Sequence, residues 1–253
     1  MGLEPELLEQ LASQLGDGAA WFEADVTDGT ALQRAVDGTV ERFGGIDVAI
    51  ANAGVMFVEP LSGAAENVER TFDVNLLGVW RTNRAVLPHV IERKGYLLNV
   101  ASQGAAMHVP LTGAYGASKA GVEALTNTLR LELHPTGTSV GCAYFGIIDT
   151  DMLRAGARHP AWGISQRLSP RFARHPVPVS RAVDAIERGI ENRAARIWAP
   201  RYVGVALLGR GIVQPIIDKR LTRSPLLSEA LHCTESEHVP HADPVLGISH
   251  PPG

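Results

Sequence analysis

The stretch IDVAIANAG, residues 46–54, is an apolar run with β-branched residues, and Gly54 closes it. A strand that is buried on both faces of a sheet has this character. The runs GYLLNVAS at 95–102 and TSVGCAYFG at 138–146 share it, and helical patterns lie between the three. Strand and helix therefore alternate along the chain. This predicts an α/β fold with a doubly wound parallel sheet and helices on both faces.

Weaker patterns extend the alternation towards both ends of the chain. Further strands are expected at 19–26 and 196–200. Helices are expected at 5–15, 29–43, 64–93, 113–133 and 180–193. Residues 1–220 are predicted to form one domain. Residues 221–253 hold five prolines and little periodicity, so a loosely ordered tail is expected there.

The composition argues against several classes of protein. The chain has 253 residues and a formal net charge of −4, so nothing indicates a nucleic-acid partner. Cys142 and Cys233 are too few for a disulfide framework, and the acidic start shows no signal peptide. The longest candidate for a membrane segment, 201–220, is interrupted by Arg210 and Pro215. These features predict a soluble, cytoplasmic protein with no transmembrane segment.

The candidate catalytic residues begin at Ser102. Tyr115 follows thirteen residues later, and Lys119 four residues after that. Side chains at this last spacing share one face of a helix. A free phenol has a pKa of about 10, and a neighbouring ammonium lowers it towards the range of a useful base. Ser102 ends a predicted strand, so its hydroxyl can donate to a substrate oxygen while Tyr115 moves the proton.

This S-x12-Y-x3-K spacing resembles the short-chain dehydrogenase/reductase family, and the resemblance covers about residues 5–200. ANAG at 51–54 is similar to the family's N-N-A-G, and Asn75 in DVNLLG matches its catalytic Asn. Asp25-Val26 matches the family's contact to the adenine ring, and FGIIDT at 145–150 its P-G-x-x-x-T. Five motifs in the family's order are far more specific than one Y-x-x-x-K.

The resemblance implies the roles of these residues. Tyr115 would be the general acid/base and Ser102 would polarise the carbonyl. Lys119 would bind the nicotinamide ribose and tune Tyr115, while Asn75 would support Lys119 through a water. NAD or NADP would be held by Asp25, Val26, Asn52, Ala53, Gly54, Tyr115, Lys119, Gly146, Ile148 and Thr150. A hydride would then move between the nicotinamide and a small-molecule alcohol or carbonyl substrate. No metal is implied.

The sequence departs from the family at three places. Phe145 replaces a Pro and Ala51 replaces an Asn, and neither change excludes activity. The larger departure is at the start, because the chain begins in what aligns with the family's second helix. The first βα portion of the Rossmann-type fold, with its Gly-rich pyrophosphate turn, is expected to be missing. Either the start codon is assigned too late, or the chain is a non-catalytic remnant that serves as an interaction module. Exposed strand edges would favour a homo-oligomer.

Several residues have a plainer structural interpretation. Asp25 can cap a turn, Thr150 can cap a helix, and Asn75 can be a satisfied polar residue at a helix bend. VASQG at 100–104 comes close to a hydrolase elbow, but Val100 stands where a Gly is required, so a hydrolase is disfavoured.

The C-terminal part leaves further alternatives open. HCTESEHVPHAD at 232–243 could bind a metal, although a polar tail is favoured. Residues 203–217 are expected to form a lid over the substrate cleft or a subunit contact, in preference to a membrane surface. The segments 151–180 and 201–217 would cover the substrate, and their apolar residues suggest a lipophilic one.

Overall fold

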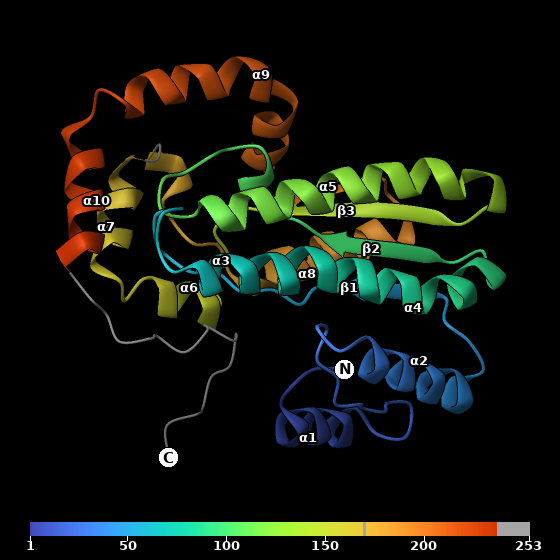
Figure 1. Ribbon diagram of the computed structural model, residues 1–253. Helices are drawn as coiled ribbons and strands as arrows, with labels where there is room; N and C mark the ends of the chain where they lie inside the picture. Colours follow the sequence, from blue (N-terminus) through green and yellow to red (C-terminus); the bar gives the residue numbers. More distant parts are fainter. Residues whose placement is uncertain (169–170, 237–253) are drawn as a thin grey trace.

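The computed structural model describes residues 1–168 and 171–236 (Figure 1). Its centre is a four-stranded parallel sheet in the order β1-β2-β3-β4. The strands are β1 (Val48–Ala51), β2 (Tyr96–Val100), β3 (Ser139–Phe145) and β4 (Arg196–Ala199). The α/β fold with a parallel sheet is therefore confirmed, and each strand comes from an apolar run that the sequence marks.

Helices cover both faces of this sheet. On one face, α4 (Gly78–Glu92) and α5 (Gly113–Leu133) pack against a cluster that includes Leu97 and Val140. On the other face, α8 (Val179–Glu191) packs against Leu98 and Ile197. Adjacent positions of β2 therefore face opposite layers, which is why its sequence is apolar throughout.

The outer strand β1 is poorly covered on one of its two faces. Val48 and Ile50 pair with Tyr96 and Leu98, so they lie on the α8 face. They are nevertheless 41% and 42% exposed, because α8 packs over β3 and β4. This face of β1 thus presents apolar side chains to solvent in the described part of the chain.

The N-terminal segment forms two helices beside the sheet (Figure 1). α1 (Pro5–Leu15) has no buried residue, whereas α2 (Gly29–Phe43) buries Leu32 and Val36 and is capped by Asp28. The strand expected at 19–26 is wrong. This segment makes an isolated bridge between Glu23 and Gly2 and does not join the sheet. Alternating apolar residues form a strand only where a ladder partner is present.

The helix expected at 64–93 is divided into three elements. α3 (Ala65–Phe72) leads into a π-helical turn, η1 (Asp73–Leu77), and α4 follows directly. Pro88 lies inside α4 and does not end it. A π turn inserts an extra residue into a helix and often occurs at functional sites. Here it directs Asn75 into the protein interior, where the side chain is fully buried.

The C-terminal elements cover the carboxyl end of the sheet. These elements are α6 (Asp151–Gly156), α7 (Pro160–Leu168), α9 (Arg201–Leu221) and α10 (Pro225–Ser236), and the short turn η4 (Arg171–Ala173) follows α7. Two other turns lie earlier in the chain: η2 (Gln103–Ala105) follows β2, and η3 (His134–Thr136) follows α5. α10 packs on α7 through Ala161 and Ala230, which are fully buried, and Arg167 pairs with Glu229 at 3.1 Å.

The tail expected at 221–253 is therefore wrong for residues 225–236, because a helix with a buried apolar side forms there. The remaining part, 237–253, lies outside the described residues, and so do most of the possible metal ligands of the tail. Of the helices in residues 1–168 and 171–236, none has the length and apolar character needed to cross a bilayer.

Candidate active site

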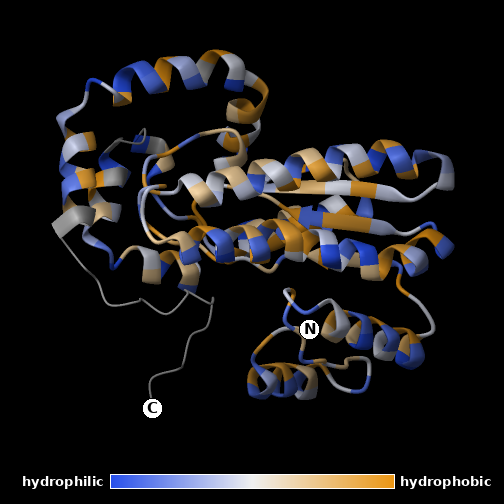
Figure 2. Cartoon of the chain, in the orientation of Figure 1, coloured by the Kyte–Doolittle hydropathy of each residue, from blue (hydrophilic) through white to orange (hydrophobic). Residues whose placement is uncertain are grey.

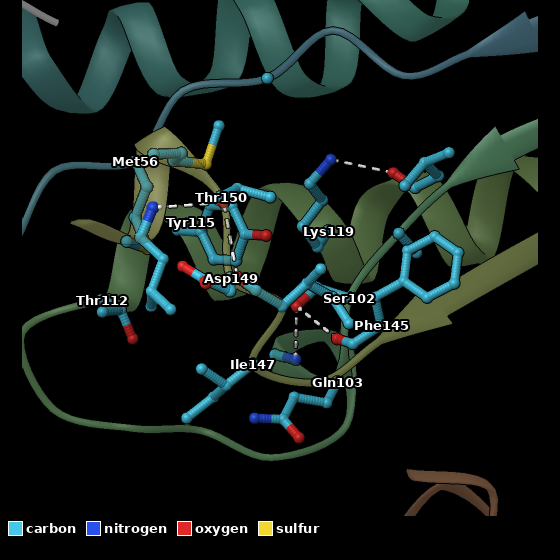
Figure 3. Close-up of a pocket in the computed structure, with 18 of the residues that line it drawn as sticks. Met56, Ser102, Gln103, Thr112, Tyr115, Lys119, Phe145, Ile147, Asp149 and Thr150 are labelled. Atoms are coloured by element: carbon cyan, nitrogen blue, oxygen red, sulfur yellow. Dashed lines mark hydrogen bonds between the residues drawn. The ribbon is translucent and has the colours of Figure 1, made fainter. Parts of the chain in front are cut away.

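A cavity of about 500 Å³ lies beyond the carboxyl ends of β1, β2 and β3 (Figure 3). Ser102, Tyr115 and Lys119 all line it. They come from the loop after β2 and from the first two turns of α5. In open parallel sheets, ligands bind at this edge. The fold therefore brings the three residues of the S-x12-Y-x3-K spacing to one place.

Ser102 is held between two loops. Its Oγ accepts a hydrogen bond from the Gly104 amide at 3.1 Å and contacts the Phe145 carbonyl at 3.5 Å. The residue is 8% exposed, so little water competes for its hydroxyl. This position lets the hydroxyl turn from the weak Phe145 contact to an oxygen in the cavity.

Tyr115 is the third residue of α5, and its ring lies beside Ser102 (Figure 3). Gly104 lies next to both side chains, since a Cβ built on it would be 3.6 Å from the Ser102 Oγ and 3.6 Å from the Tyr115 ring. Burial raises the pKa of Tyr115, and a hydrogen bond with Ser102 partly lowers it. In the free protein the phenol therefore stays protonated at neutral pH.

Lys119 lies one turn further along α5. Its ammonium donates to the Val100 carbonyl at 2.9 Å and lies 5.8 Å from the centre of the Tyr115 ring. The residue is 3% exposed, and burial lowers its pKa to about 8. A Cβ on Gly54 would lie 3.5 Å from the Nζ, so glycine keeps the space beside the ammonium open.

Asn75 is close to this cluster but does not line the cavity. Its amide accepts from the Val55 N–H at 2.7 Å and donates to the Val55 carbonyl at 2.9 Å. It also donates to the Ser118 hydroxyl at 3.1 Å. The side chain thus ties the loop after β1 to α5. The support for Lys119 through a water stays a prediction.

We expect Asn75→Ala to lower the free energy of unfolding by roughly 2–4 kcal/mol, because it leaves the buried backbone of Val55 without partners. Urea denaturation measures the change. Asn83→Ala is the matched control, since the buried Asn83 amide has no hydrogen-bond partner among the described residues. That control should stay within about 1 kcal/mol. Equal losses in both variants would contradict a specific role for the Asn75 amide.

The loop after β3 supplies Gly146, Ile148 and Thr150 to the cavity. A Cβ on Gly146 would lie 2.7 Å from the Tyr202 hydroxyl, so a side chain does not fit there. Thr150 caps α6 by accepting from the Leu153 amide at 3.3 Å. Its plainer interpretation as a helix cap is therefore correct, and its position on the cavity still allows a second contact.

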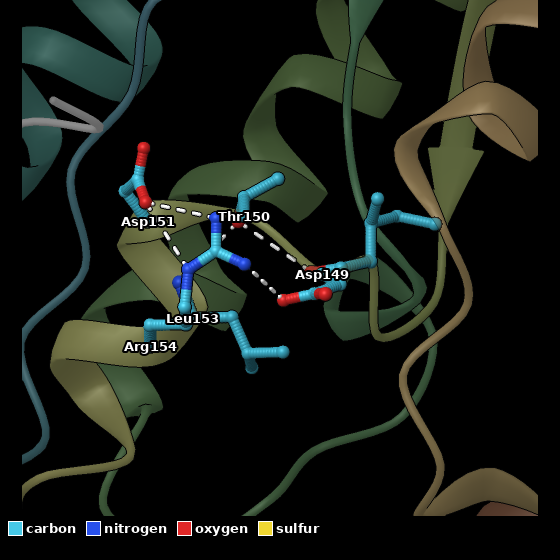
Figure 4. A network of polar contacts seen from close by, with 6 residues as sticks. Asp149, Thr150, Asp151, Leu153 and Arg154 are labelled. Carbon is cyan, nitrogen blue, oxygen red and sulfur yellow. Dashed lines mark hydrogen bonds and ion pairs between the residues drawn. The ribbon is translucent and has the colours of Figure 1, made fainter. Parts of the chain in front are cut away.

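A polar network holds the same loop in place (Figure 4). Arg154 pairs with Asp149 at 2.6 Å and with Asp151 at 2.9 Å. All three residues are at least partly exposed, so the network contributes little to global stability. It fixes the path of the chain between Gly146 and α6.

The remaining residues of the predicted cofactor set lie in different places. Asn52 and Gly54 line the cavity, whereas Ala53, Asp25 and Val26 do not. Asp25 accepts from the Thr27 amide at 2.8 Å and so caps a turn. Val26 packs against α4, where a Cβ on Gly78 would lie 2.7 Å from it. These contacts agree with the structural interpretation of Asp25, and the adenine role stays a prediction.

The sequence motifs do not include the apolar wall of the cavity. Met56, Met107 and Met152 line it together with Trp162. The chain has four methionines, and all except Met1 are at this cavity. Methionine is flexible and polarisable, so it suits a wall that adapts to apolar ligands. Composition alone gave no signal, because the three residues are about 50 positions apart.

Comparison with known proteins gives consistent results. A profile described as short chain dehydrogenase matches residues 1–160. An uncharacterized NAD-dependent oxidoreductase of Mycobacterium tuberculosis is 36% identical over 157 residues, which are 61% of this chain and 54% of that protein. 3beta-hydroxysteroid dehydrogenase 1 of Eggerthella lenta is 33% identical over 161 residues, 62% of each chain. The chain thus spans roughly half to three fifths of the length of these relatives.

Solved structures agree with the fold over most of the chain. A short-chain dehydrogenase from Streptomyces avermitilis has a TM-score of 0.70 and 25% identity, covering 90% of this chain and 86% of that one. A short chain dehydrogenase from Burkholderia cenocepacia in complex with NADP has a TM-score of 0.67 and 25% identity, covering 81% of each chain.

Proposed function

Because the chain belongs to the short-chain dehydrogenase family, we propose that it is an NAD(P)-dependent oxidoreductase acting on an alcohol or a ketone. The observation that carries this proposal is the convergence of Ser102, Tyr115 and Lys119 on one cavity. The names of the relatives support it, since they include an NAD-dependent oxidoreductase and a hydroxysteroid dehydrogenase.

The proposed chemistry divides between the protein and the cofactor. The nicotinamide, when bound, supplies or accepts the hydride. Tyr115 gives a proton to the carbonyl oxygen during reduction and takes it back during oxidation. Ser102 donates a hydrogen bond to the same oxygen, and the Lys119 ammonium stabilises the phenolate of Tyr115. Their close packing at the end of β2 supports these roles.

The cavity fits one end of a dinucleotide. Asn52, Gly54, Gly146 and Thr150 surround the open space beside Lys119, and two of these positions have no room for a Cβ without a shift of neighbours. We propose that the ribose and nicotinamide bind here. Among residues 1–168 and 171–236 no Gly-rich turn between a strand and a helix lies at the cavity to hold the pyrophosphate.

The function is tested by incubating the 253-residue chain with NAD⁺ or NADP⁺ and secondary alcohols of increasing size: 2-butanol, cyclohexanol and a 3β-hydroxysteroid. Turnover is expected for the cyclic alcohols, because Met56, Met107 and Trp162 form an apolar wall. We propose that the KM for the cofactor exceeds about 100 µM, which rests on the expectation that the Gly-rich backbone N–H site for the pyrophosphate is missing.

Nicotinamide fluorescence is the control for cofactor binding. Gly54→Val should abolish the weak binding of NADH, because its side chain enters the space beside Lys119 and Asn75. Micromolar binding by the unmodified chain would contradict the expected weak affinity. The absence of turnover with every alcohol, at saturating cofactor, would contradict the enzyme and favour the alternative, a non-catalytic interaction module.

Two further points belong to this proposal. We propose that the chain is a homo-oligomer, and the outer strand β1, whose Val48 and Ile50 are exposed on one face, supports association there. We also propose a cytoplasmic location, which the unpaired thiols of Cys142 and Cys233 support.

A further inference from the structure

The outer face of α9 carries a row of exposed apolar side chains. Val205, Leu208, Ile212 and Ile216 are 72%, 75%, 75% and 65% exposed. We call these four residues the α9 stripe. They recur at intervals of three and four residues, which is the spacing of one helical face, although α9 contains Pro215 and changes direction along its length (Figure 1). The stripe is therefore an exposed apolar surface along α9, which a solvated helix does not need.

The opposite side of α9 packs against the rest of the protein. Val203 and Leu221 are buried near its two ends. In the middle, Arg210 pairs with Glu123 of α5 at 2.7 Å, and Gln214 accepts from the His108 amide at 3.2 Å. α9 lies at the periphery of the fold (Figure 1), and apolar and polar segments alternate along it (Figure 2). The stripe points outwards because the opposite face of α9 contacts α5 and the loop at His108.

Cationic residues lie at both ends of the stripe. Arg201 is the first residue of α9, and Lys219 and Arg220 lie in its last turn, beyond the stripe. Asp218, the one acidic residue of α9, lies on the far side and binds Gln214 at 2.6 Å. The face thus combines apolar residues in the middle with positive charge at each end.

Positive charge is concentrated in the part of the chain that contains α9. Residues 196–223 contain six arginines and lysines and one aspartate, a net charge of +5. Because the whole chain carries −4, the remaining residues carry −4 − 5 = −9. A cationic strip on an acidic protein favours a partner with a negative surface.

The partner that fits both features is an anionic lipid surface. A second copy pairing stripe to stripe would bring Arg201 against Lys219 in an antiparallel arrangement, or like ends together in a parallel one. Both arrangements place positive charges side by side. We propose that α9 docks in the plane of an anionic bilayer, with the stripe at the boundary of headgroups and acyl chains and its cations on the lipid phosphates.

Trp198 and the cavity rim extend this surface. Trp198 packs against the start of α9, where a Cβ on Gly204 would lie 2.7 Å from its ring, and it is partly exposed. Indole rings favour the interface between lipid and water. His108, which binds α9, lies between Met107 and Val109 of the cavity wall. If the proposed function holds, docking brings an apolar substrate cavity close to the membrane.

The test is flotation of the 253-residue chain with vesicles of phosphatidylcholine alone, or of phosphatidylcholine and phosphatidylserine in equal parts. Wild type is expected to float with the anionic vesicles and to be released by salt. Leu208→Glu with Ile212→Glu should weaken binding by about a hundredfold or more, since two buried apolar contacts are lost. Leu131→Glu, on α5 and also 75% exposed at Leu131, is the matched control and should bind as wild type does.

A second pair of variants tests the charge separately. It keeps the proposal testable even if the Leu208→Glu and Ile212→Glu variant misfolds. Lys219→Gln with Arg220→Gln should weaken anionic binding by about thirtyfold, because each cation near such a surface contributes about fivefold. Arg181→Gln with Arg188→Gln, on the exposed side of α8, should change little.

Three outcomes would overturn the proposal. The first is equal binding to neutral and anionic vesicles, and the second is wild-type binding by the Leu208→Glu and Ile212→Glu variant. The third is a failure of wild type to bind either vesicle, and light scattering then shows whether wild type is a dimer and the stripe variant a monomer. A dimeric wild type with a monomeric variant would assign the stripe to a second copy. Because vesicle binding needs no turnover, failure here is distinguishable from failure of the proposed enzyme.

Discussion

Tyr115→Phe is expected to reduce turnover by about 10²–10⁴-fold, because it removes the group that exchanges a proton with the substrate oxygen. The change deletes one oxygen and keeps the ring. The ring contact with Lys119 and the packing at Gly104 therefore remain. NADH should bind the variant as it binds wild type. The measurement is kcat with the alcohol of the panel that wild type oxidises best, at saturating cofactor.

Tyr144→Phe is the matched control. It removes the same atom from a buried tyrosine of β3 whose hydroxyl donates to Glu123 at 3.1 Å, away from the cavity. This variant should lose some stability and retain kcat. Turnover near the wild-type rate in Tyr115→Phe, or equal losses in both variants, would contradict the assignment of Tyr115 as the acid/base.

Lys119→Met is expected to abolish most activity and to change how stability depends on pH. Without the ammonium, the pKa of Tyr115 rises further, so residual activity should shift to higher pH. It should also weaken binding of the cofactor ribose. We expect a loss of at least about a hundredfold in kcat/KM. Lys94→Met, at an exposed lysine outside the site, is the control.

The stability effect follows from the pKa of Lys119, which burial lowers from 10.5 to about 8. Below pH 8 the lysine is charged in both the folded and the unfolded chain, and folding then includes its full desolvation cost. Between pH 8 and 10.5 only the unfolded chain keeps the proton, so the folded state of wild type gains stability as the pH rises. Relative to Lys119→Met, this gain should reach roughly 3 kcal/mol.

Urea denaturation of both proteins across this pH range measures the difference. Other groups titrate as well, but those away from Lys119 cancel in the comparison, and Tyr115→Phe introduced into both proteins removes the neighbour whose pKa depends on Lys119. If the difference in the free energy of unfolding between wild type and variant stays constant with pH, the ammonium of Lys119 is solvated in the folded state. A decreasing difference would reverse the sign of its pKa shift.

The sequence predicts those parts of the fold that local pattern controls. The strands at 46–54 and 95–102 are apolar throughout because both layers cover them, and such runs are visible without a structure. α2 and its Asp28 cap follow from short-range chemistry. The segment 19–26 has similar composition but no ladder partner, and the sequence cannot show whether a partner is present.

The candidate site could likewise be predicted where its residues are close together in the sequence. The spacing of Tyr115 and Lys119 is local, so it survives in the structure as one helical face. The hydrogen bonds of Asn75 to Val55 depend on a π turn, which has no clear pattern in DVNLL. The methionine wall depends on three distant loops meeting at one cavity. Helix α10 was missed because its apolar side is short and becomes meaningful only against α7.

The π turn η1 divides residues 65–92 into two helices, α3 and α4, and the direction in which each helix faces is set independently. α3 and α4 each keep their own inward face, and the extra residue in the turn absorbs the mismatch between them. Deleting one residue from 73–77 would rotate α4 relative to α3 by about 100°. Either Asn75 would leave the interior, or Val86 and Val90 would leave the sheet. Apart from the buried Asn75 and Val74, the chain can therefore exchange residues in this turn more easily than it can change their number.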